Sequence, residues 1–432
     1  MSRLRAIPHI ACAFAVNILG AACDQPDVAT AGVTVRDSAG IRVVHNTSAS
    51  DSVTAHVAEV QRIGRVGGPG QYRFGRVSAI AVDRHDSLFI AEERTATIRV
   101  FDRDGRFARA LGQRGGDPDD LGSIVRIWLY GDTIAVMHIR DGLRMAFFVR
   151  DGRFVASSPA ELADGTHLTP IARVSDGWLA WVRAPRREVR SGPGVVHEDT
   201  SKLHLLDPRV RTVGPLVRVG RGQRLVSVPP AGLDWPLFEP QAGAAVTTNG
   251  TQYVAHPSYR IDIFDATGRL VRRVTRAHTP VAITRTDVES LKERIRRRYR
   301  DQPAVDPTES VDRMLARIDA QESARIETQW SALGRVVASD DGSFWVERAD
   351  LRPDRWRAEY ENLYGESDPE TATTARAHHW DRFDSEGRFL GAIELPRGFR
   401  PAVLEAREVL GVLSDGSGAE YVVRYSVTDR RP

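Results

Sequence analysis

The stretch Phe101-Asp-Arg-Asp-Gly-Arg-Phe107 decides the fold, because near copies of it return three times along the chain. The copies are Phe148-Val-Arg-Asp-Gly-Arg-Phe154, Phe264-Asp-Ala-Thr-Gly-Arg-Leu270 and Phe383-Asp-Ser-Glu-Gly-Arg-Phe389. Each places alternating apolar residues on both sides of an Asp/Gly turn, which is the local chemistry of a β-hairpin whose turn needs a positive φ at glycine. The sequence therefore predicts a repeat protein built from hairpins.

Four short strands surround the first copy, at residues 78–83, 87–91, 97–101 and 107–111. Four strands joined by tight turns form one blade of a β-propeller. The final stretch of the chain is one strand short, and residues 58–64 can supply that strand and close the ring without exposed edges. We therefore predict an all-β, six-bladed β-propeller of four-stranded antiparallel blades over residues 33–428, with blades at 78–116, 124–158, 169–220, 242–275, 335–395 and 401–427, the last closed by 58–64.

A small helical insertion, residues 277–332, is predicted between blades 4 and 5. Thr286-Asp-Val-Glu289 has the pattern of a capping box, and Val288, Leu291 and Ile295 recur at helical spacing after it. Residues 311–318 offer a second helix of the same kind. The basic run at 292–300 suits either contact with phospholipid heads or an acidic partner, or a solvated helix face.

The N-terminus predicts export. Arg3 and Arg5 precede an apolar stretch at 10–19 and a run of small residues, so residues 1–22 read as a signal peptide too short to span a membrane. Cys23 follows Gly20-Ala-Ala, which resembles the lipobox of bacterial lipoproteins, although an aliphatic residue is usual where Gly20 stands. We expect a lipid on Cys23, a tether over 23–32, and a location in the bacterial cell envelope facing the periplasm or the cell exterior; ordinary cleavage near Ala22 is the alternative.

Composition limits the other functions. Hydrophobic residues make up 41% of the 432 residues and charged ones 27%, as in an ordinary soluble domain. The net charge is only +3, so we predict no nucleic-acid partner despite the many arginines. The two cysteines are Cys12 and Cys23, and the first lies in the predicted signal peptide, which excludes an intramolecular disulfide in the mature chain.

Four segments resemble bacterial six-bladed β-propeller proteins of the NHL-repeat-like group. They are Val60-Gln-Arg-Ile-Gly64, Gly67-Gly-Pro-Gly-Gln-Tyr-Arg-Phe74, the unit from Leu88-Phe-Ile-Ala-Glu92 to Ile98-Arg-Val-Phe-Asp102, and Leu111-Gly-Gln-Arg-Gly115. The resemblance is strongest over residues 58–116 and departs from the family pattern at 116–122. It implies an envelope lipoprotein of a group in which most members have no assigned biochemical role.

Every long insertion, at 184–201, 216–241, 276–334 and 349–378, is expected on one face of the disc, and binding groups tend to lie on loops held by a rigid scaffold. The entrances of the innermost strands on that face are more cationic than chelating, which suits an anionic ligand. They offer, among others, Arg76, Arg126, Arg173, Thr247, Arg335 and Arg400. Repeated polar residues at this face also arise in a propeller without any function. The candidate ligand face comprises Glu92, Arg94, Arg126, His138, Arg140, Arg173, His256, Tyr259, Arg335 and Arg400.

Two functions fit this sequence. The first is a non-catalytic binding platform for an anionic small molecule, glycan, peptide or envelope protein, attached to the membrane by its lipid and needing no cofactor. The second, implied by related propellers, is a metal-dependent, lactonase-like hydrolase or lyase with an axial site. A calcium site needs six to eight oxygen ligands, and the cationic strand entrances disfavour it. His378 and His379 are neighbours on a predicted strand, so both cannot easily bind one ion.

Overall fold

The computed structural model describes residues 28–30, 32–49, 52–117, 119–160, 168–174, 177–182, 187–190, 195–198, 202–206, 212–218, 224–227, 233–234, 243–301, 311–323, 329–351, 378–405, 407–415 and 417–429. The predicted signal peptide and Cys23 lie outside these residues, as do parts of the tether and of the loops at 184–201 and 216–241 and most of 349–378. Among the residues described, no helix has the length and apolar character needed to cross a membrane.

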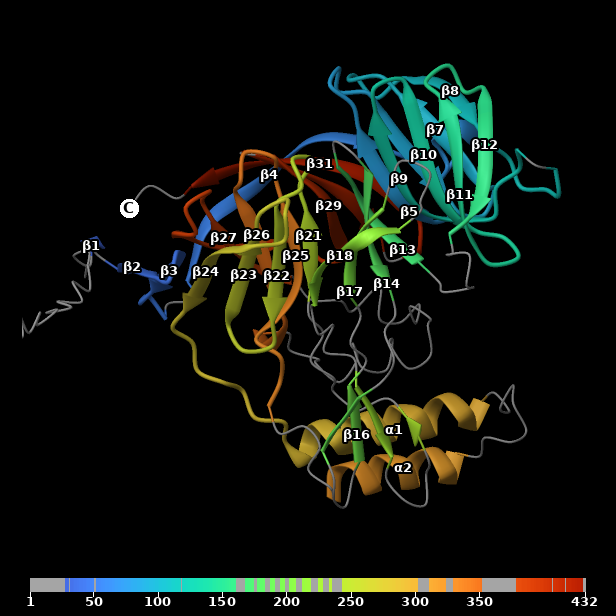
Figure 1. Ribbon diagram of the computed structural model, residues 1–432. Coiled ribbons are helices and arrows are strands. Elements are labelled where there is room, and N and C mark those ends of the chain that lie inside the picture. Colours follow the sequence, from blue (N-terminus) through green and yellow to red (C-terminus); the bar gives the residue numbers. More distant parts are fainter. Residues whose placement is uncertain are drawn as a thin grey trace, which may run out of the picture.

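Antiparallel β-sheets make up most of the structure (Figure 1). Among the described residues four sheets have four strands each, and three of these contain the strands from β5 to β14 together with β17 and β18. The first contains β5 (Val77–Val82), β6 (Leu88–Glu92), β7 (Thr97–Phe101) and β8 (Phe107–Leu111) in this order; the second β9 (Ser123–Tyr130), β10 (Thr133–Ile139), β11 (Leu143–Val149) and β12 (Phe154–Pro159); the third β13 (Leu168–Val174), β14 (Gly177–Val182), β17 (Lys202–Leu206) and β18 (Thr212–Arg218).

Two larger sheets incorporate the N-terminal strands. One runs β21 (Ala244–Val246), β22 (Gln252–His256), β23 (Arg260–Phe264) and β24 (Leu270–Arg276), and continues through β3 (Ile41–Asn46), β2 (Val33–Ser38) and β1 (Val28–Thr30). The other joins β25 (Leu333–Ala338), β26 (Phe344–Arg348), β27 (His378–Phe383) and β28 (Phe389–Leu395) to β31 (Glu420–Asp429), β30 (Glu408–Ser414) and β29 (Phe399–Glu405) through β4 (Val53–Ile63). β3 is parallel to β24, whereas β4 is parallel to β28 and antiparallel to β31.

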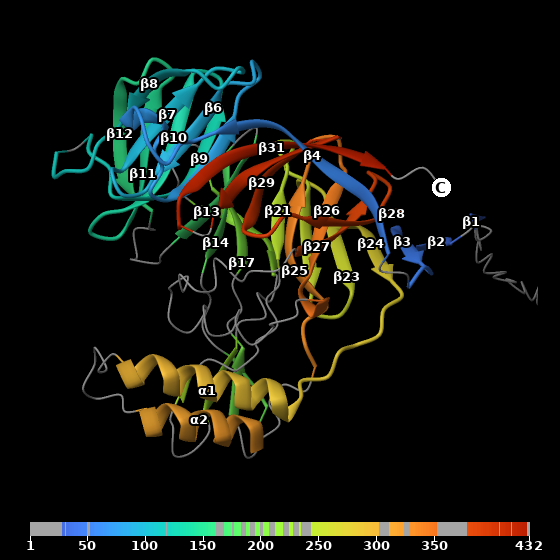
Figure 2. The ribbon, with the colours of Figure 1, turned by 180° about the vertical axis from the view of Figure 1, so that it is seen from behind.

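Asn46 fastens this N-terminal segment to two sheets. Its completely buried amide donates hydrogen bonds to the carbonyl oxygens of Thr275, at 3.2 Å, and Gly387, at 3.1 Å, and accepts one from the N–H of Phe389 at 2.8 Å. Thr275 belongs to β24, and Phe389 begins β28. The segment from β3 to β4 therefore ties neighbouring sheets together from their outer edges, as both ribbon views show (Figures 1 and 2).

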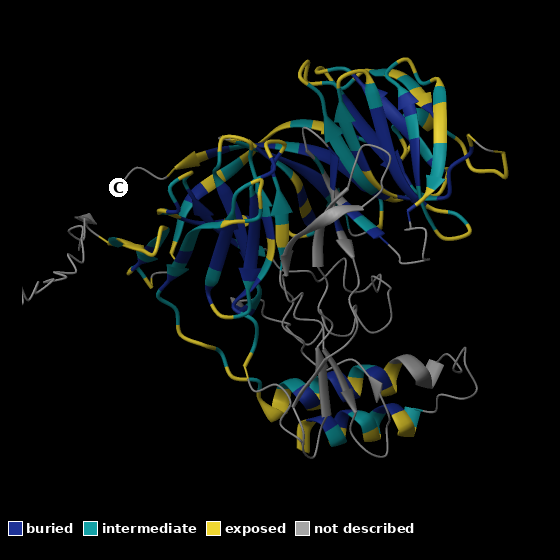
Figure 3. Cartoon of the chain, in the orientation of Figure 1, coloured by how far each residue is buried: buried dark blue, intermediate teal, exposed yellow. Residues whose placement is uncertain are grey.

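The first strands of these antiparallel units meet at the centre. β5 contacts β9, and the contacts continue in chain order through β13, β21, β25 and β29, which returns to β5. Sheets arranged radially in such a closed cycle form a β-propeller. Buried residues concentrate on the strands, with exposed ones at turns and outer edges (Figure 3).

The repeated Asp/Gly turns are observed as the sequence predicts. Gly105, Gly268 and Gly387 have φ of 77°, 83° and 82°, a region that favours glycine. In these three turns the opening aspartate accepts main-chain N–H bonds from residues two and four positions later, as Asp102 does from Asp104 at 3.0 Å and Arg106 at 2.8 Å. The turn chemistry therefore comes from local sequence alone.

Aromatic residues of the repeats fill the core. Phe101, Phe148, Phe344 and Phe383 are at most 2% exposed, and the rings of Phe344 and Phe383 stack at 4.9 Å. Phe264 occupies the same place in its repeat but is only partly buried.

Two helices lie between β24 and β25: α1 (Arg285–Asp301) and α2 (Val311–Ser323). They pack through Val288, Leu291, Ile295, Met314 and Ile318, the apolar positions that helical spacing predicts. The predicted capping box at Thr286 to Glu289 is wrong by two residues. Thr284 accepts the Asp287 N–H at 3.2 Å and donates its own N–H to that carboxylate at 2.9 Å, because the helix begins at Arg285.

A further sheet contains β15 (Arg187–Arg190), β16 (Val195–Glu198), β19 (Arg224–Ser227) and β20 (Leu233–Asp234). Its strands come from the loops at 184–201 and 216–241, which pair with each other through β16 and β19. This sheet and the two helices lie on the same side of the propeller (Figures 1 and 2). Short 3₁₀ turns occur at η1 (Gly70–Tyr72) and η2 (Ala349–Leu351).

Candidate functional site

A cavity of about 470 Å³ opens at the centre of the ring. Its walls come mainly from the inner strands β5, β9 and β29, with single residues from the inner strand β25, from β10 and β30, and from the connections before β5 and after β6. Arg76, Ser123, Arg335 and Arg400 mark the starts of the four inner strands, so the cavity lies where the chain enters them. α2 precedes β25, so the helical insertion enters the ring at this same face.

Each of the four inner strands is irregular where it lines the cavity. The register with the next strand shifts between Val77 and Ala79, between Ile124 and Arg126, between Leu333 and Val336, and between Pro401 and Val403. A β-bulge leaves a residue outside the ladder and redirects its side chain. The residues within these irregularities, Ser78, Val125, Arg335 and Ala402, all line the cavity.

Three arginines enter the cavity. The side chain of Arg76 is 60% exposed, and those of Arg335 and Arg400 are each 45% exposed. Guanidinium groups that line a cavity and still reach water can meet a ligand there.

A carboxylate orients each arginine. Glu93 lies 2.9 Å from Arg76 Nε, and Glu347 lies 3.3 Å from Arg335 Nε. Arg400 Nη2 donates to Glu420 Oε1 at 2.7 Å. Of these carboxylates only Glu93 lines the cavity, whereas Glu347 and Glu420 are buried behind it. The cavity lining therefore carries three guanidinium groups and one carboxylate, although each arginine has an acidic partner.

Glu420 also fixes the seam between β31 and β5. Its second oxygen accepts the main-chain N–H of Val77, and its first accepts the Ser414 hydroxyl at 3.2 Å. Glycine at 411 is required by close packing, because a side chain there would overlap the carbonyl oxygen of Arg400. These contacts hold Arg400 in a fixed position at the cavity.

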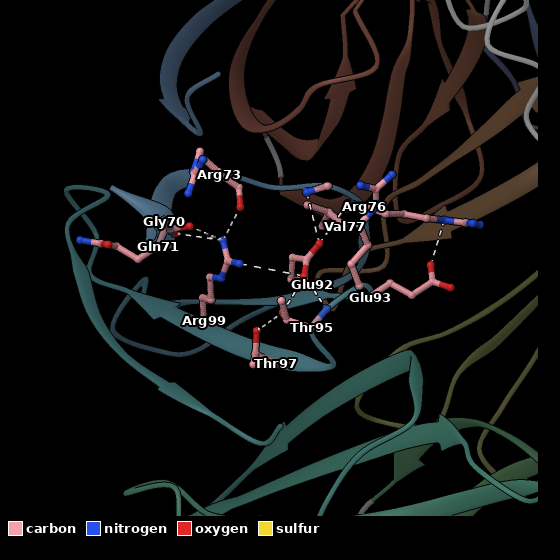
Figure 4. A network of polar contacts seen from close by, with 12 residues as sticks. Gly70, Gln71, Arg73, Arg76, Val77, Glu92, Glu93, Thr95, Thr97 and Arg99 are labelled. Atoms are coloured by element: carbon pink, nitrogen blue, oxygen red, sulfur yellow. Dashed lines mark hydrogen bonds and ion pairs between the residues drawn. The ribbon is translucent and has the colours of Figure 1, made fainter. Parts of the chain in front are cut away.

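Glu92, a predicted ligand residue, is instead buried beside the cavity (Figure 4). Thr95 donates to it from its N–H at 2.8 Å and its hydroxyl at 2.6 Å, and Gly75 and Arg76 donate main-chain N–H bonds at 3.2 and 3.3 Å. Burial opposes ionisation of Glu92, but these hydrogen bonds outweigh it and lower its pKa. The carboxylate therefore holds the loop that carries Arg76.

Arg99 completes this network from β7. It donates to the carbonyl oxygens of Gly70 and Gln71, each at 3.2 Å, and of Arg73 at 2.6 Å, and lies 4.0 Å from Glu92 (Figure 4). Arg99 thus fastens the turn at 70–73 to the sheet.

The same structural role recurs at the end of the second strand in other units. His138 Nδ1 accepts the N–H of Gly122 at 3.0 Å, and Glu347 accepts the N–H of Arg335 at 3.3 Å. Like Glu92, each residue satisfies main-chain donors where the preceding inner strand begins. His138 is completely buried, and this burial, with Arg140 and Arg144 nearby, lowers its pKa from 6.5 to about 4.

The remaining predicted residues lie outside the cavity. Arg140 donates to the carbonyl oxygens of Asp117 and Asp120, at 2.6 and 2.9 Å, and anchors that loop. Arg173 donates to the Gly177 carbonyl and lies over the ring of Tyr130, 4.9 Å from its centroid.

Two other predicted arginines also lie outside the cavity lining. The side chain of Arg94 packs over Gly75, where a methyl group would overlap it. Arg126 follows Val125 on β9; it reaches water but is enclosed by protein on most sides, which lowers the pKa of its guanidinium.

His256 belongs to a polar cluster on β22 and β23. Its Nε2 lies 3.1 Å from Asp262, whose carboxylate also pairs with Arg273 at 2.7 Å and Arg260 at 3.5 Å. Burial raises the pKa of Asp262, but these partners outweigh it and lower the value to about 2. The carboxylate is therefore ionised at neutral pH.

Tyr259 is buried in a separate ionic cluster. Its hydroxyl donates to Asp381, which also accepts Arg276 Nη1 at 2.8 Å and lies 3.7 Å from Arg348. Burial and the neighbouring Asp381 raise the pKa of Tyr259 well above 10. Breaking such a buried group of ions by removing one member is strongly destabilising, so the cluster bears on the stability of the fold.

Two of the ten predicted site residues, Arg335 and Arg400, line the cavity. Arg76, which the sequence places at the entrance of an inner strand, lines it as well. Glu347, Glu420 and the apolar residues Val125 and Ile139 had not been singled out. A signal for Glu347 exists in the sequence, because it follows a short apolar run, Phe344-Trp-Val346, as Glu92 follows Leu88-Phe-Ile-Ala91. His378 Nδ1 lies 2.7 Å from Glu347. Among the residues described, no three His, Cys, Asp or Glu side chains group as a metal site.

Comparisons with known proteins concern the fold. No family model matches this sequence, and no curated protein matches it. A candidate exported protein from Bacteroides fragilis NCTC 9343 matches with a TM-score of 0.50 and 8% identity, over 90% of this chain and 100% of that one. A DUF4221 family member from Bacteroides vulgatus ATCC 8482 gives 0.49 and 6%, over 87% and 99%. Virginiamycin B lyase from Staphylococcus aureus gives 0.37 and 7%, over 86% and 99%.

Proposed function

We propose that this protein is an exported, non-catalytic binding protein of the cell envelope that takes an anionic small molecule into its axial cavity. One observation carries the proposal: three arginines, one directly before β5 and the others in β25 and β29, enter one cavity and remain about half exposed or more. A guanidinium has five N–H donors, so the single carboxylate that orients each arginine leaves donors for a ligand.

The size and shape of the cavity support a small ligand. Its volume of about 470 Å³ lies within the range of small-molecule sites. A bound carboxylate would meet donors already held in place by Glu347 and Glu420, so little side-chain ordering would oppose binding.

We further propose six blades of four strands. The closed cycle of six inner strands supports this count, with β29, β30, β31 and β4 forming the last blade. Pairing of β4 with β31 would then join the N-terminal and C-terminal parts of the ring.

The proposed location rests on the predicted signal peptide, residues 1–22, and on Cys23. A lipid at Cys23 would attach the protein to a membrane, facing the periplasm or the cell exterior, through the tether that follows it. The similar fold of the candidate exported protein from Bacteroides fragilis agrees with this location.

A thermal-shift measurement tests the function, because a ligand that binds only the native state raises its apparent stability. The secreted Cys23→Ser chain, which carries no lipid, is mixed with matched pairs: acetate and acetamide, glucuronate and glucose, a short peptide and its C-terminal amide. We expect stabilisation by the acids and none by their neutral partners.

The same measurement includes calcium with and without chelator. Chelator-sensitive stabilisation by calcium, without any effect of the acids, would contradict the proposal and favour the metal-dependent hydrolase or lyase. No shift with any compound would also contradict it, and would direct attention to a protein or glycan partner.

A further inference from the structure

The cavity has an apolar wall as well as a cationic one. Val125 is 38% exposed and Ile139 is 53% exposed, and both line the cavity. Large aliphatic side chains at the centre of a ring are normally packed away from water. These two come from β9 and β10, the strands of a single sheet.

The two walls lie on opposite sides of the ring. In the cycle of inner strands, β9 is separated from β25 by three steps in either direction, so Val125 and Arg335 face each other across the axis. β29, which carries Arg400, adjoins β25, and β5, which directly follows Arg76, lies between β29 and β9. The lining therefore changes from cationic at β25 and β29 to apolar at β9.

Packing fixes the apolar wall in place. Gly122 precedes β9, and any side chain there would overlap the main-chain oxygen of Ile139. This close approach sets Ile139 at the rim beside Ser123, with which it is paired in the ladder. Val125 is directed out of the ladder by the β-bulge of β9.

From this arrangement we infer that the cavity selects a monocarboxylate with an apolar tail, its carboxylate at Arg335 and Arg400 and its tail against Val125 and Ile139. This inference rests on the proposed function and names its ligand class. A dicarboxylate would place its second charge against the apolar wall, where burial of an unpaired charge is costly. An alcohol with the same tail would leave the arginines without an anionic partner.

Isothermal titration calorimetry of the full Cys23→Ser chain with butyrate, hexanoate and octanoate tests the inference. Full burial of one methylene raises affinity about fourfold. With only half of the added tail buried, octanoate should still bind at least about tenfold more tightly than butyrate. Suberate, the dicarboxylate of equal length, and octanol should both bind at least about tenfold more weakly than octanoate.

The double variant Val125→Ser/Ile139→Ser should lose this dependence on chain length, so that its affinities for octanoate and butyrate lie within about twofold of each other. Both residues are partly exposed, so their replacement has a small effect on folding. Val60→Ser/Val155→Ser is the matched control, since these valines are 53% and 60% exposed and lie outside the cavity lining. It should behave as the wild type.

Four results would overturn the inference. Equal affinity for all chain lengths, or tighter binding of suberate, would leave anion binding intact and refute the apolar selection. Octanol binding as tightly as octanoate would show that the arginines contribute nothing. Absence of binding by every carboxylate would refute the proposed function and this inference together.

Discussion

His138 should make the stability of the protein fall at mildly acidic pH. Its pKa is lowered from 6.5 to about 4 in the folded protein, mainly because it is buried. Between these two values the unfolded chain binds the proton and the folded protein does not, so falling pH favours unfolding. The contribution of neutral His138 to the free energy of unfolding is fully present above pH 6.5 and is lost progressively down to about pH 4.

The size of the effect follows from the two pKa values. At about 1.36 kcal/mol for each pH unit, the difference corresponds to about 3 kcal/mol of unfolding free energy. His138→Asn removes the titration and keeps an oxygen near the position of Nδ1, so the hydrogen bond from Gly122 is retained. We expect this variant to lose about 3 kcal/mol less than the wild type between pH 6.5 and 4.

Urea unfolding followed by tryptophan fluorescence at several pH values measures the difference. The pH dependence of the variant is compared with that of the wild type measured at the same pH values. His85→Asn, a change at an exposed histidine, should retain the full pH dependence of the wild type. If the unfolding free energies of His138→Asn and His85→Asn depend on pH in the same way, then His138 is not held neutral by its burial beside the Gly122 N–H.

Three further predictions concern the cavity and the hydrogen bonds of Asn46, which fasten the N-terminal segment to two sheets. Asn46→Ala should lower the unfolding free energy by about 3 kcal/mol, since three hydrogen bonds of about 1 kcal/mol each are lost. If Asn249→Ala, at an exposed turn, lowers the unfolding free energy by as much, Asn46 does not fasten the two sheets. Glu93→Gln should raise the affinity for a carboxylate about two- to fivefold by calorimetry, because it removes the one acidic group from the cavity lining; a weaker complex would contradict this reasoning. Gly411→Ala should lower the melting temperature and weaken carboxylate binding, because the new methyl group displaces Arg400; unchanged values of both would show that β29 adjusts freely.

The sequence predicts the β-propeller class because its decisive signals are local. Asp102 and Gly105 form their turn with bonds that span two to four residues, and this chemistry repeats wherever the pattern recurs. The capping box illustrates the limit of such patterns. Thr284 and Thr286 are both followed three residues later by an acid, and only the true start of α1 decides between them.

The membership of the site was harder to predict because it depends on register. A β-bulge of one residue places Val125 and Ser78 in the cavity, and no local signal in the sequence marks where those irregularities fall. Glu92 and His138 stand at polar positions on the expected face, yet both satisfy main-chain donors instead. Which polar residue serves the fold and which faces the cavity depends on partners far away in the chain.

The central claim is that the arginines of the axial cavity bind an anion. It is tested most directly by calorimetric titration of octanoate into the wild type, Arg335→Gln/Arg400→Gln, and the control Arg103→Gln/Arg106→Gln, whose side chains are 76% and 77% exposed away from the cavity. A hydrogen bond to a charged group contributes about 1.5–3 kcal/mol, so the first variant should lose at least about tenfold in affinity and the control almost nothing. Equal affinity of all three proteins would contradict the claim.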